Sequence, residues 1–389
     1  MSKNIFEFFS DSDTVHFAYG EYFSSDESPD VSLIHLLSLD TDKLKPFTKA
    51  VLDESEYPQD FKETMKEIRF GIHAYSQFQD ILDIAISFDN PNDSMLNRHY
   101  CYYESLVYLR ESVVAWLEEN ILAGLVLLRP FLELAVFHLY WYLRCKDGDY
   151  EPFYKWLTNE KGKPPFKNQF EYVFSHLPTL NWLDEKRINL TKTTLENIYR
   201  TCCAYNHTPK VDESILSLGS GRGQISALGF FYYLSFANIL LRQVVHLYVL
   251  AYPMSLFPVE RHKKWAVSGP VGLFFDKNNF AILAAYLGKE TVSGLRKKLV
   301  LMPEIKSLLE WYEQHPDLSA EEINTDWERF KKENNIQQDA EHIGQMIASG
   351  KSHSRALGWA LNYLQVPKNV DDISDEMLTK MRQLLRVWK

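Results

Sequence analysis

Residues 195–207 read LENIYRTCCAYNH, and the spacing of their apolar side chains decides the expected fold. Leu195, Ile198, Cys202 and Tyr205 follow one another at intervals of three, four and three residues. On an α-helix such residues lie on one side, because a turn takes about 3.6 residues. A helix with one apolar stripe buries that stripe against neighbouring helices. The stretch therefore predicts one helix of a helical bundle.

The other side of this expected helix carries the residues that suggest chemistry. Glu196, Arg200, Cys203 and His207 are again three or four residues apart. Arg200 and His207 are seven residues apart, so their side chains point in directions that differ by about 20°. Pro209 follows, and the residue before a proline is pushed out of the helical region. We expect the helix to end at or near His207.

Two interpretations of the Arg200 and His207 pair stay open. Arginine is always charged and its planar fork fits a phosphate, whereas histidine titrates near neutrality and can move protons, so the two suit phosphodiester chemistry. In the structural alternative, Arg200 pairs with Glu196 one turn back and His207 caps the C-terminus of the helix. Spacing alone does not separate the two, because arginine and histidine meet on many helices by chance.

The overall composition limits the classes of protein to consider. The chain has 389 residues, which predicts two or three domains, and a net charge of −10, which argues against a broad basic surface for duplex DNA. A local basic site is compatible with this charge. The four cysteines show no CxxC spacing and suit neither a disulfide framework nor a zinc site. We therefore expect a cytoplasmic protein with no metal and no cofactor.

The chain divides into three expected parts. Residues 1–60 form an acidic extension, with 13 acidic residues against 4 lysines, that either covers a basic surface or is a solvated arm. Residues 61–258 form a helical core, and residues 259–389 form a C-terminal domain that is mostly helical. The expected fold class is thus all-α. Periodicity and end signals predict helices over 61–88, 97–145, 225–252, 303–312, 319–333, 339–348, 353–364 and 374–388, whereas 272–287 fits either strands or a helix.

Pro130 lies inside the longest of these segments and predicts a kink or a break near Arg129, because proline disrupts a helix interior. Arg129 and Glu133 stand four residues apart in an otherwise apolar run, where burying either charge alone is costly. They either pair with each other or reach a polar site elsewhere in the bundle. These charges also argue against a membrane span over 121–141, and the apolar run 225–241 is at the short limit for one. No stable membrane insertion is expected.

Two loops complete the set of candidate sites. Residues 161–165 read KGKPP, a basic loop that is either a nucleic-acid contact or an ordinary solvated turn. Residues 216–223, LSLGSGRG, are rich in glycine but show neither the preceding strand nor the GK[ST] pattern of a phosphate-binding loop. We interpret this second loop as a flexible connection.

Arg200 and His207, with six residues between them near a helix end, resemble the R-x(4–6)-H motif of the HEPN superfamily. The order of parts adds to the resemblance. The segment 129–133, Arg-Pro-Phe-Leu-Glu, lies in an apolar helix before the motif, and another apolar helix follows it. The resemblance covers approximately the expected core, residues 61–258. Thr201 stands where the family usually has Asn or Asp after the arginine.

HEPN proteins are helical bundles of bacterial toxin–antitoxin, abortive-infection and other phage-defence systems. The resemblance implies a metal-independent endoribonuclease that acts on RNA, forms a homodimer with a site shared between its subunits, and needs no cofactor. Arg200 and His207 are then the catalytic pair, and Arg129, Glu133 and Asn206 bind the substrate or support that pair. The alternative is a non-catalytic helical scaffold subunit of a defence complex, with a regulatory protein as its partner.

Overall fold

A computed structural model describes residues 59–78, 81, 95–157, 160–206, 227–259, 264, 277–322, 325–326 and 329. Helices take up about 81% of the described residues, and none of these residues lies in a strand. The expected all-α fold class is therefore confirmed. The helices expected over 339–348, 353–364 and 374–388 lie outside the described residues, as do His207 and nearly all of the acidic extension.

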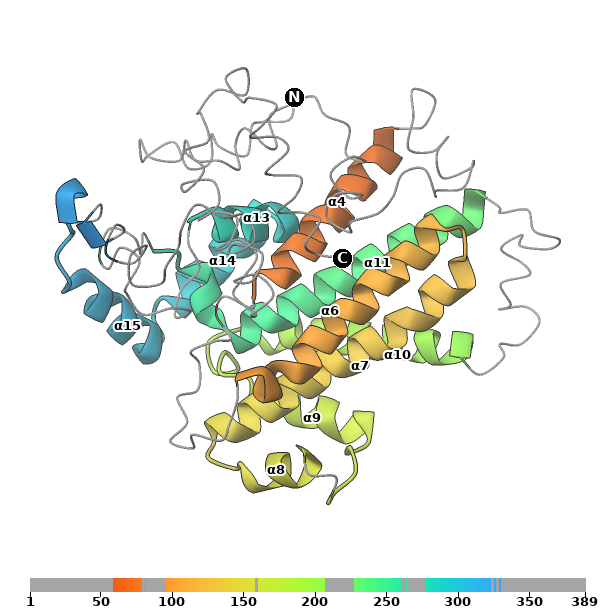
Figure 1. The fold of residues 1–389 in the computed structure, drawn as a ribbon, viewed down its shortest axis with the longest axis horizontal. Helices are drawn as coiled ribbons and strands as arrows, with labels where there is room; N and C mark the ends of the chain where they lie inside the picture. The colour runs from red at the N-terminus through yellow and green to blue at the C-terminus, as the bar shows by residue number, and fades with distance from the viewer. Residues whose placement is uncertain are drawn as a thin grey trace.

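The centre of the bundle is a pair of long helices, α6 (Met95–Leu117) and α7 (Ile121–Lys146), joined by a loop of three residues. They lie side by side in Figure 1. Glu119 reverses the chain with a φ of 65°, in the left-handed region. Asn120 then caps α7, because its side-chain oxygen accepts a hydrogen bond from the backbone N–H of Ala123 at 3.2 Å.

A kink or a break was expected near Arg129, and the break is wrong: α7 continues through Pro130, and the helical segment is interrupted at residues 118–120 instead. The kink stays a prediction. A proline inside a helix costs about 3 kcal/mol, because one hydrogen bond is lost and the ring crowds the preceding turn. Leu125, Leu128 and Phe131 around it are fully buried, and each contributes about 1.5–3 kcal/mol by burial. The summed burial outweighs the cost of the proline, so tertiary packing keeps the helix continuous.

Helices α6, α7 and α11 (Ala227–Ala251) come close together at one point, where hydrogen bonds join all three. The Ser112 hydroxyl on α6 donates to the carbonyl of Gly124 on α7 at 2.7 Å, and the hydroxyls of Ser112 and Tyr233 on α11 are 2.7 Å apart. A Cβ atom at Gly124 would lie 2.9 Å from the ring of Tyr233. Glycine at this position therefore allows α7 and α11 to come this close.

The remaining helices of the bundle surround α7 and α11. Both α9 (Phe166–His176) and α10 (Glu185–Asn206) pack on α7, and α10 also contacts α11. The short α8 (Glu151–Leu157) follows the end of α7 and lies near α9 in Figure 1. Helix α4 (Gln59–Ser76) packs on another side of α11. It matches the first part of the helix expected over 61–88, of which residues 79–80 and 82–88 lie outside the described residues.

Three further helices follow the bundle. The chain leaves α11 through a 3-10 turn, η5 (Pro253–Leu256), and continues in α13 (Lys277–Leu287), α14 (Lys289–Leu299) and α15 (Pro303–Glu313). The ambiguous segment 272–287 thus contains a helix, and α14 is a helix that periodicity missed. Since α13 packs on α4 and α11, and α14 on η5, the buried apolar cluster extends from the bundle into these helices. Ser319 and Glu322 form a capping box, with the Glu322 N–H donating to Ser319 Oγ at 3.2 Å and the Ser319 N–H donating to Glu322 Oε2 at 2.7 Å.

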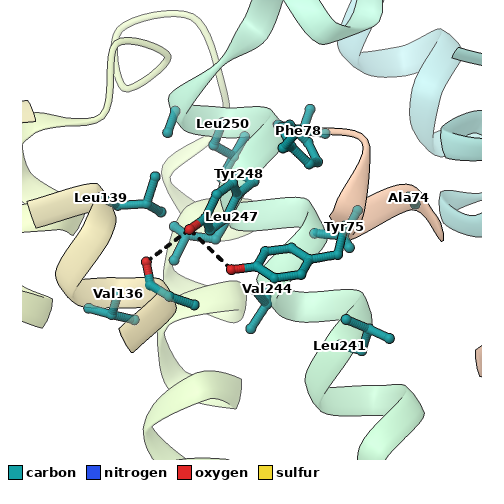
Figure 2. Packing of buried hydrophobic residues seen from close by; sticks show 14 of the residues in the cluster. Ala74, Tyr75, Phe78, Val136, Leu139, Leu241, Val244, Leu247, Tyr248 and Leu250 are labelled. Carbon is teal, nitrogen blue, oxygen red and sulfur yellow. Dashed lines mark hydrogen bonds between the residues drawn. The ribbon is translucent and has the colours of Figure 1, made fainter. Parts of the chain in front are cut away.

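Aromatic side chains with hydrogen-bonded hydroxyls fill the middle of the core. Tyr75 on α4 and Tyr248 on α11 point toward one another in Figure 2, and the Tyr75 hydroxyl donates to the Tyr248 hydroxyl at 3.2 Å. The Tyr248 hydroxyl donates in turn to the carbonyl of Ala135 on α7, also at 3.2 Å. Buried polar groups are costly unless they are hydrogen-bonded, so these contacts let α4, α7 and α11 share one core.

Two described helices, α7 over Ile121–Lys146 and α11 over Gly229–Ala251, are long and apolar enough to cross a membrane by length and composition. Of the most apolar window in each, 56% and 67% respectively are buried within the molecule, as happens in the core helix of a soluble bundle. The two helices are thus weak evidence for a membrane, and the expectation of no stable insertion stays a prediction.

Candidate functional site

Residues 195–206 form the C-terminal half of α10, as the apolar spacing predicts. Leu195, Ile198 and Cys202 are buried against the bundle, so this part of the expected stripe is confirmed. Tyr205 is only partly buried, and its hydroxyl donates to the hydroxyl of Tyr232 on α11 at 2.7 Å. The buried stripe fixes the rotation of α10, and with it the direction in which the opposite residues point.

Arg200 points away from the bundle, and 75% of its side chain is exposed. Its nearest acidic partner is Glu196 one turn back, with 4.0 Å between Arg200 Nη2 and Glu196 Oε2. The partner required by the structural alternative is therefore present. An exposed pair of this kind stabilises a helix by only about 0.3–0.5 kcal/mol, so a phosphate can compete for the guanidinium at little cost.

Of the two candidate residues at this end of α10, the structure describes Asn206 but not His207. The Asn206 side-chain amide donates to the backbone carbonyl of Cys202 at 2.9 Å, and thereby satisfies a carbonyl near the C-terminus of the helix. His207 lies outside the described residues, so its position relative to Arg200 rests on the helical spacing alone.

Arg129 and Glu133 belong to a polar cluster beneath α10, which we call the Glu133 cluster: Arg129, Glu133, Lys163 and Tyr199. Arg129 Nε lies 2.9 Å from Glu133 Oε1, so the two residues pair with each other. Lys163 Nζ lies 3.3 Å from Glu133 Oε2, and the Tyr199 hydroxyl donates to Glu133 Oε1 at 3.2 Å. Arg129 and Glu133 thus pair with each other, as one interpretation of the sequence required. Through Tyr199 they also belong to a larger polar site in the bundle, as the other interpretation required.

The protonation states in the Glu133 cluster follow from its geometry. Burial raises the pKa of Glu133, but the hydrogen bond from Arg129 and the charge of Lys163 outweigh burial and hold that pKa below its usual value. Burial, together with the nearby Cys203 side chain and the charge of Glu133, raises the pKa of Tyr199 to about 12. At neutral pH the carboxylate is therefore charged and the phenol protonated, which is the combination that each hydrogen bond requires.

Lys163 and Tyr199 are the members of this cluster that sequence reasoning missed. Lys163 was part of the basic loop 161–165, but its partner Glu133 is 30 residues earlier in the chain. Tyr199 stands directly before Arg200 and falls between the two stripes of the motif helix. Its ring stacks on Phe166, the first residue of α9, with the ring centres 3.9 Å apart. The position of Tyr199 beside the motif was the signal that could have identified it.

No three His, Cys, Asp or Glu side chains in the described part of the chain come together in a group that could hold a metal ion. Cys101, Cys145 and Cys202 are buried, Cys203 is partly exposed, and all four are free thiols. In comparisons with known proteins, no family model, no curated protein and no solved structure matches the chain. What is established is the all-α class, and the resemblance to HEPN proteins rests on the motif and the order of parts in the sequence.

Proposed function

We propose that the chain is a metal-independent endoribonuclease of a bacterial phage-defence or toxin system, with Arg200 and His207 as its catalytic pair. The observation that supports this proposal best is the setting of Arg200. Its guanidinium is exposed on a helix whose rotation is fixed by a buried stripe, and its one described acidic partner holds it only weakly. Catalytic groups act best when a rigid element presents them to the substrate.

In the proposed reaction, His207 removes the proton of a ribose 2′-hydroxyl, and the 2′-oxygen attacks the adjacent phosphorus. The bond from phosphorus to the 5′-oxygen of the next nucleotide breaks, and this oxygen takes up a proton. The products are a 2′,3′-cyclic phosphate and a 5′-hydroxyl. Arg200 stabilises the negative charge that builds up on the phosphate oxygens in the transition state.

The other candidate residues support the pair in this proposal. Arg129 and Glu133 are engaged with one another and with Tyr199, so they hold α10 in place and do not contact RNA directly. Asn206 stabilises the helix end that precedes His207. A homodimer, in which two copies complete the site, is part of the proposal through the resemblance.

The proposal is tested by incubating purified protein with mixed RNA in EDTA, beside Arg200→Ala and His207→Ala. The wild type is expected to cleave RNA to 2′,3′-cyclic phosphate ends, and each substitution to reduce the rate by about 100-fold or more. Arg110→Ala is the matched control, because Arg110 is an exposed arginine that pairs with neighbouring Glu111 at 3.6 Å. Cleavage that stops in EDTA, or that persists in Arg200→Ala, contradicts the proposal.

A second candidate function is a non-catalytic interaction subunit. It is favoured by large apolar side chains on the described surface, among them Leu190 at 68% exposed and Leu301 at 65%. Exposed apolar groups of this size are common at protein interfaces when they cluster. This function predicts that the purified protein cleaves no RNA but binds a protein partner tightly. It also predicts that Arg200→Ala does not change that binding.

A further inference from the structure

The basic loop 161–165 borders a surface depression of about 540 Å³. Three segments meet there: the second half of α7, the loop itself and the first part of α9. The side chains that line it combine positive charge, aromatic rings and an amide: Lys161, Lys163, Asn168, Tyr140, Tyr172 and Pro164. This combination of groups is typical of surfaces that bind single-stranded nucleic acid.

Two acidic side chains near the depression, Glu133 and Asp149, are engaged in ion pairs, whereas within the described part of the chain Lys161 in the depression and Lys167 beside it are not. Glu133 is paired with Arg129 and Lys163, as described above, and Asp149 is paired with Arg144. Among the described residues, no carboxylate forms an ion pair with Lys161 or with Lys167, which lies in the first turn of α9. Both lysines are exposed. Their positive charge is therefore available to an anion.

The wall of the depression is held in place before any ligand arrives. The rings of Tyr140 and Tyr172 meet edge to face, with centres 5.2 Å apart and an interplanar angle of 71°. The Arg144 guanidinium lies over both rings, at 5.4 and 5.6 Å from their centres. In addition, the Gln169 side chain donates to the carbonyl of Pro164 and fixes the loop to α9. A preformed surface loses less conformational entropy when it binds.

We propose that this depression binds a single-stranded segment of RNA. Lys161 and Lys167 contact its phosphates, and one base lies against Pro164. The Tyr172 ring supports the wall instead, because His176 stacks on it with the ring centres 3.8 Å apart. The inference rests on the proposed function, because it names the surface that holds the substrate of the same enzyme. Lys163 joins this surface to the Glu133 cluster, and Tyr199 of that cluster stands next to Arg200. RNA bound in the depression is thus on the side of the bundle where α7, α9 and α10 meet.

The test measures binding without cleavage. A fluorescein-labelled 12-mer RNA with 2′-O-methyl groups on every ribose cannot be cleaved through its 2′-oxygen, and its anisotropy reports binding to the full chain. We expect Lys161→Gln/Lys167→Gln to weaken binding by roughly tenfold or more, and to reduce the slope of log K against log salt by about 1.4, or 0.7 for each phosphate.

The matched control is Lys297→Gln/Lys306→Gln, which removes two exposed lysines from α14 and α15 and should leave affinity unchanged. Circular dichroism melts check that every variant is folded. Equal affinity of the wild type and the Lys161/Lys167 variant, or no binding by the wild type, overturns the inference. So does a phosphoserine peptide that displaces the RNA at equal concentration, since the site would then recognise phosphate alone.

The two proposals fail separately. If the wild type binds the 2′-O-methyl RNA through the depression but leaves unmodified RNA intact in EDTA, the ribonuclease proposal fails and the binding site stands. If the wild type cleaves RNA and the Lys161/Lys167 variant binds as tightly as the wild type, the binding site fails and the ribonuclease stands.

Discussion

Glu133 is the residue on which the polar contacts of α7, the basic loop and α10 converge. Only 21% of its side chain is exposed, so its charge is largely removed from water. Three donors compensate: the Arg129 guanidinium, the Lys163 ammonium and the Tyr199 hydroxyl. Such a cluster stabilises the fold only while the carboxylate stays charged, because its loss would leave the partly buried donors without their acceptor.

Glu133→Gln is expected to lower the free energy of unfolding by about 1–3 kcal/mol, because Arg129 and Lys163 then face a neutral side chain. Urea unfolding followed by circular dichroism measures this change. Glu310→Gln is the control, since Glu310 is 61% exposed and its pair with Lys306 at 3.7 Å is solvated. The control should change stability by less than about 0.5 kcal/mol. Equal effects of the two substitutions would show that the Glu133 cluster contributes no more than a surface pair.

At the scale of elements, the packing of α4 on α11 and α13 depends on a glycine. A Cβ atom at Gly71 would lie 2.5 Å from Tyr286 Cζ and 2.8 Å from Leu241 Cδ2. The Tyr286 ring cannot easily move aside, because its hydroxyl donates to the backbone carbonyl of Asn238 at 3.1 Å and lies 3.0 Å from the Asn238 side-chain oxygen. The three helices therefore approach to a distance that only glycine allows at this position.

Gly71→Ala is expected to destabilise the protein by about 1–3 kcal/mol, because the added methyl group forces the tyrosine or a helix to shift. Gly294→Ala in α14 is the matched control: no atom lies within 4 Å of its added Cβ. Alanine is the better helix former, so the control should raise stability by about 1 kcal/mol. Thermal melts show whether each variant is less or more stable than the wild type. A Gly71→Ala variant that is more stable would contradict the described packing of α4.

At the scale of the whole molecule, a buried chain of polar side chains runs through the core: Tyr75, Tyr248, His138 and His99. His138 Nδ1 lies 3.0 Å from the Tyr248 hydroxyl, and His138 Nε2 lies 3.3 Å from His99 Nδ1. Because the Tyr248 proton goes to the Ala135 carbonyl, neutral His138 donates from Nδ1 and accepts at Nε2. A second proton on His138 would point at His99 inside the core.

Burial, together with His99, holds the pKa of His138 well below its usual value of 6.5. The unfolded chain therefore binds a proton at His138 as the pH falls below about 6.5, whereas the folded chain does not. Stability should fall by about 1.4 kcal/mol per pH unit from this group as the pH drops from about 6.5 toward the folded pKa. His246 acts in the same direction, because burial lowers its pKa to about 4.

Urea unfolding between pH 7 and pH 5 tests this prediction. His138→Gln should reduce the slope of stability against pH by about 1.4 kcal/mol per unit, whatever its effect at pH 7. An unchanged slope in His138→Gln would mean that the core histidine is not shielded from protons.

Part of the fold and part of the candidate site could be predicted from the chain alone. Helices α10, α11 and α15 were expected from periodicity, and α7 ends at Lys146, one residue after the expected end of the segment 97–145. The Arg129–Glu133 pair could be predicted because its members are one helical turn apart. Lys163 and Tyr199 could not be assigned to that pair, since they lie 30 and 66 residues from Glu133 in the chain.

The sequence by itself determined the all-α class, the buried stripe of α10 and the outward direction of Arg200, because these depend on hydrogen bonds and spacings within a few residues. Tertiary structure alone decided where the long segment 97–145 divides, since burial along α7 outweighs the local effect of Pro130. It also decided which polar groups meet in the Glu133 cluster and in the core. Such contacts join helices that are distant in the chain, and only the packing of the whole bundle sets their register.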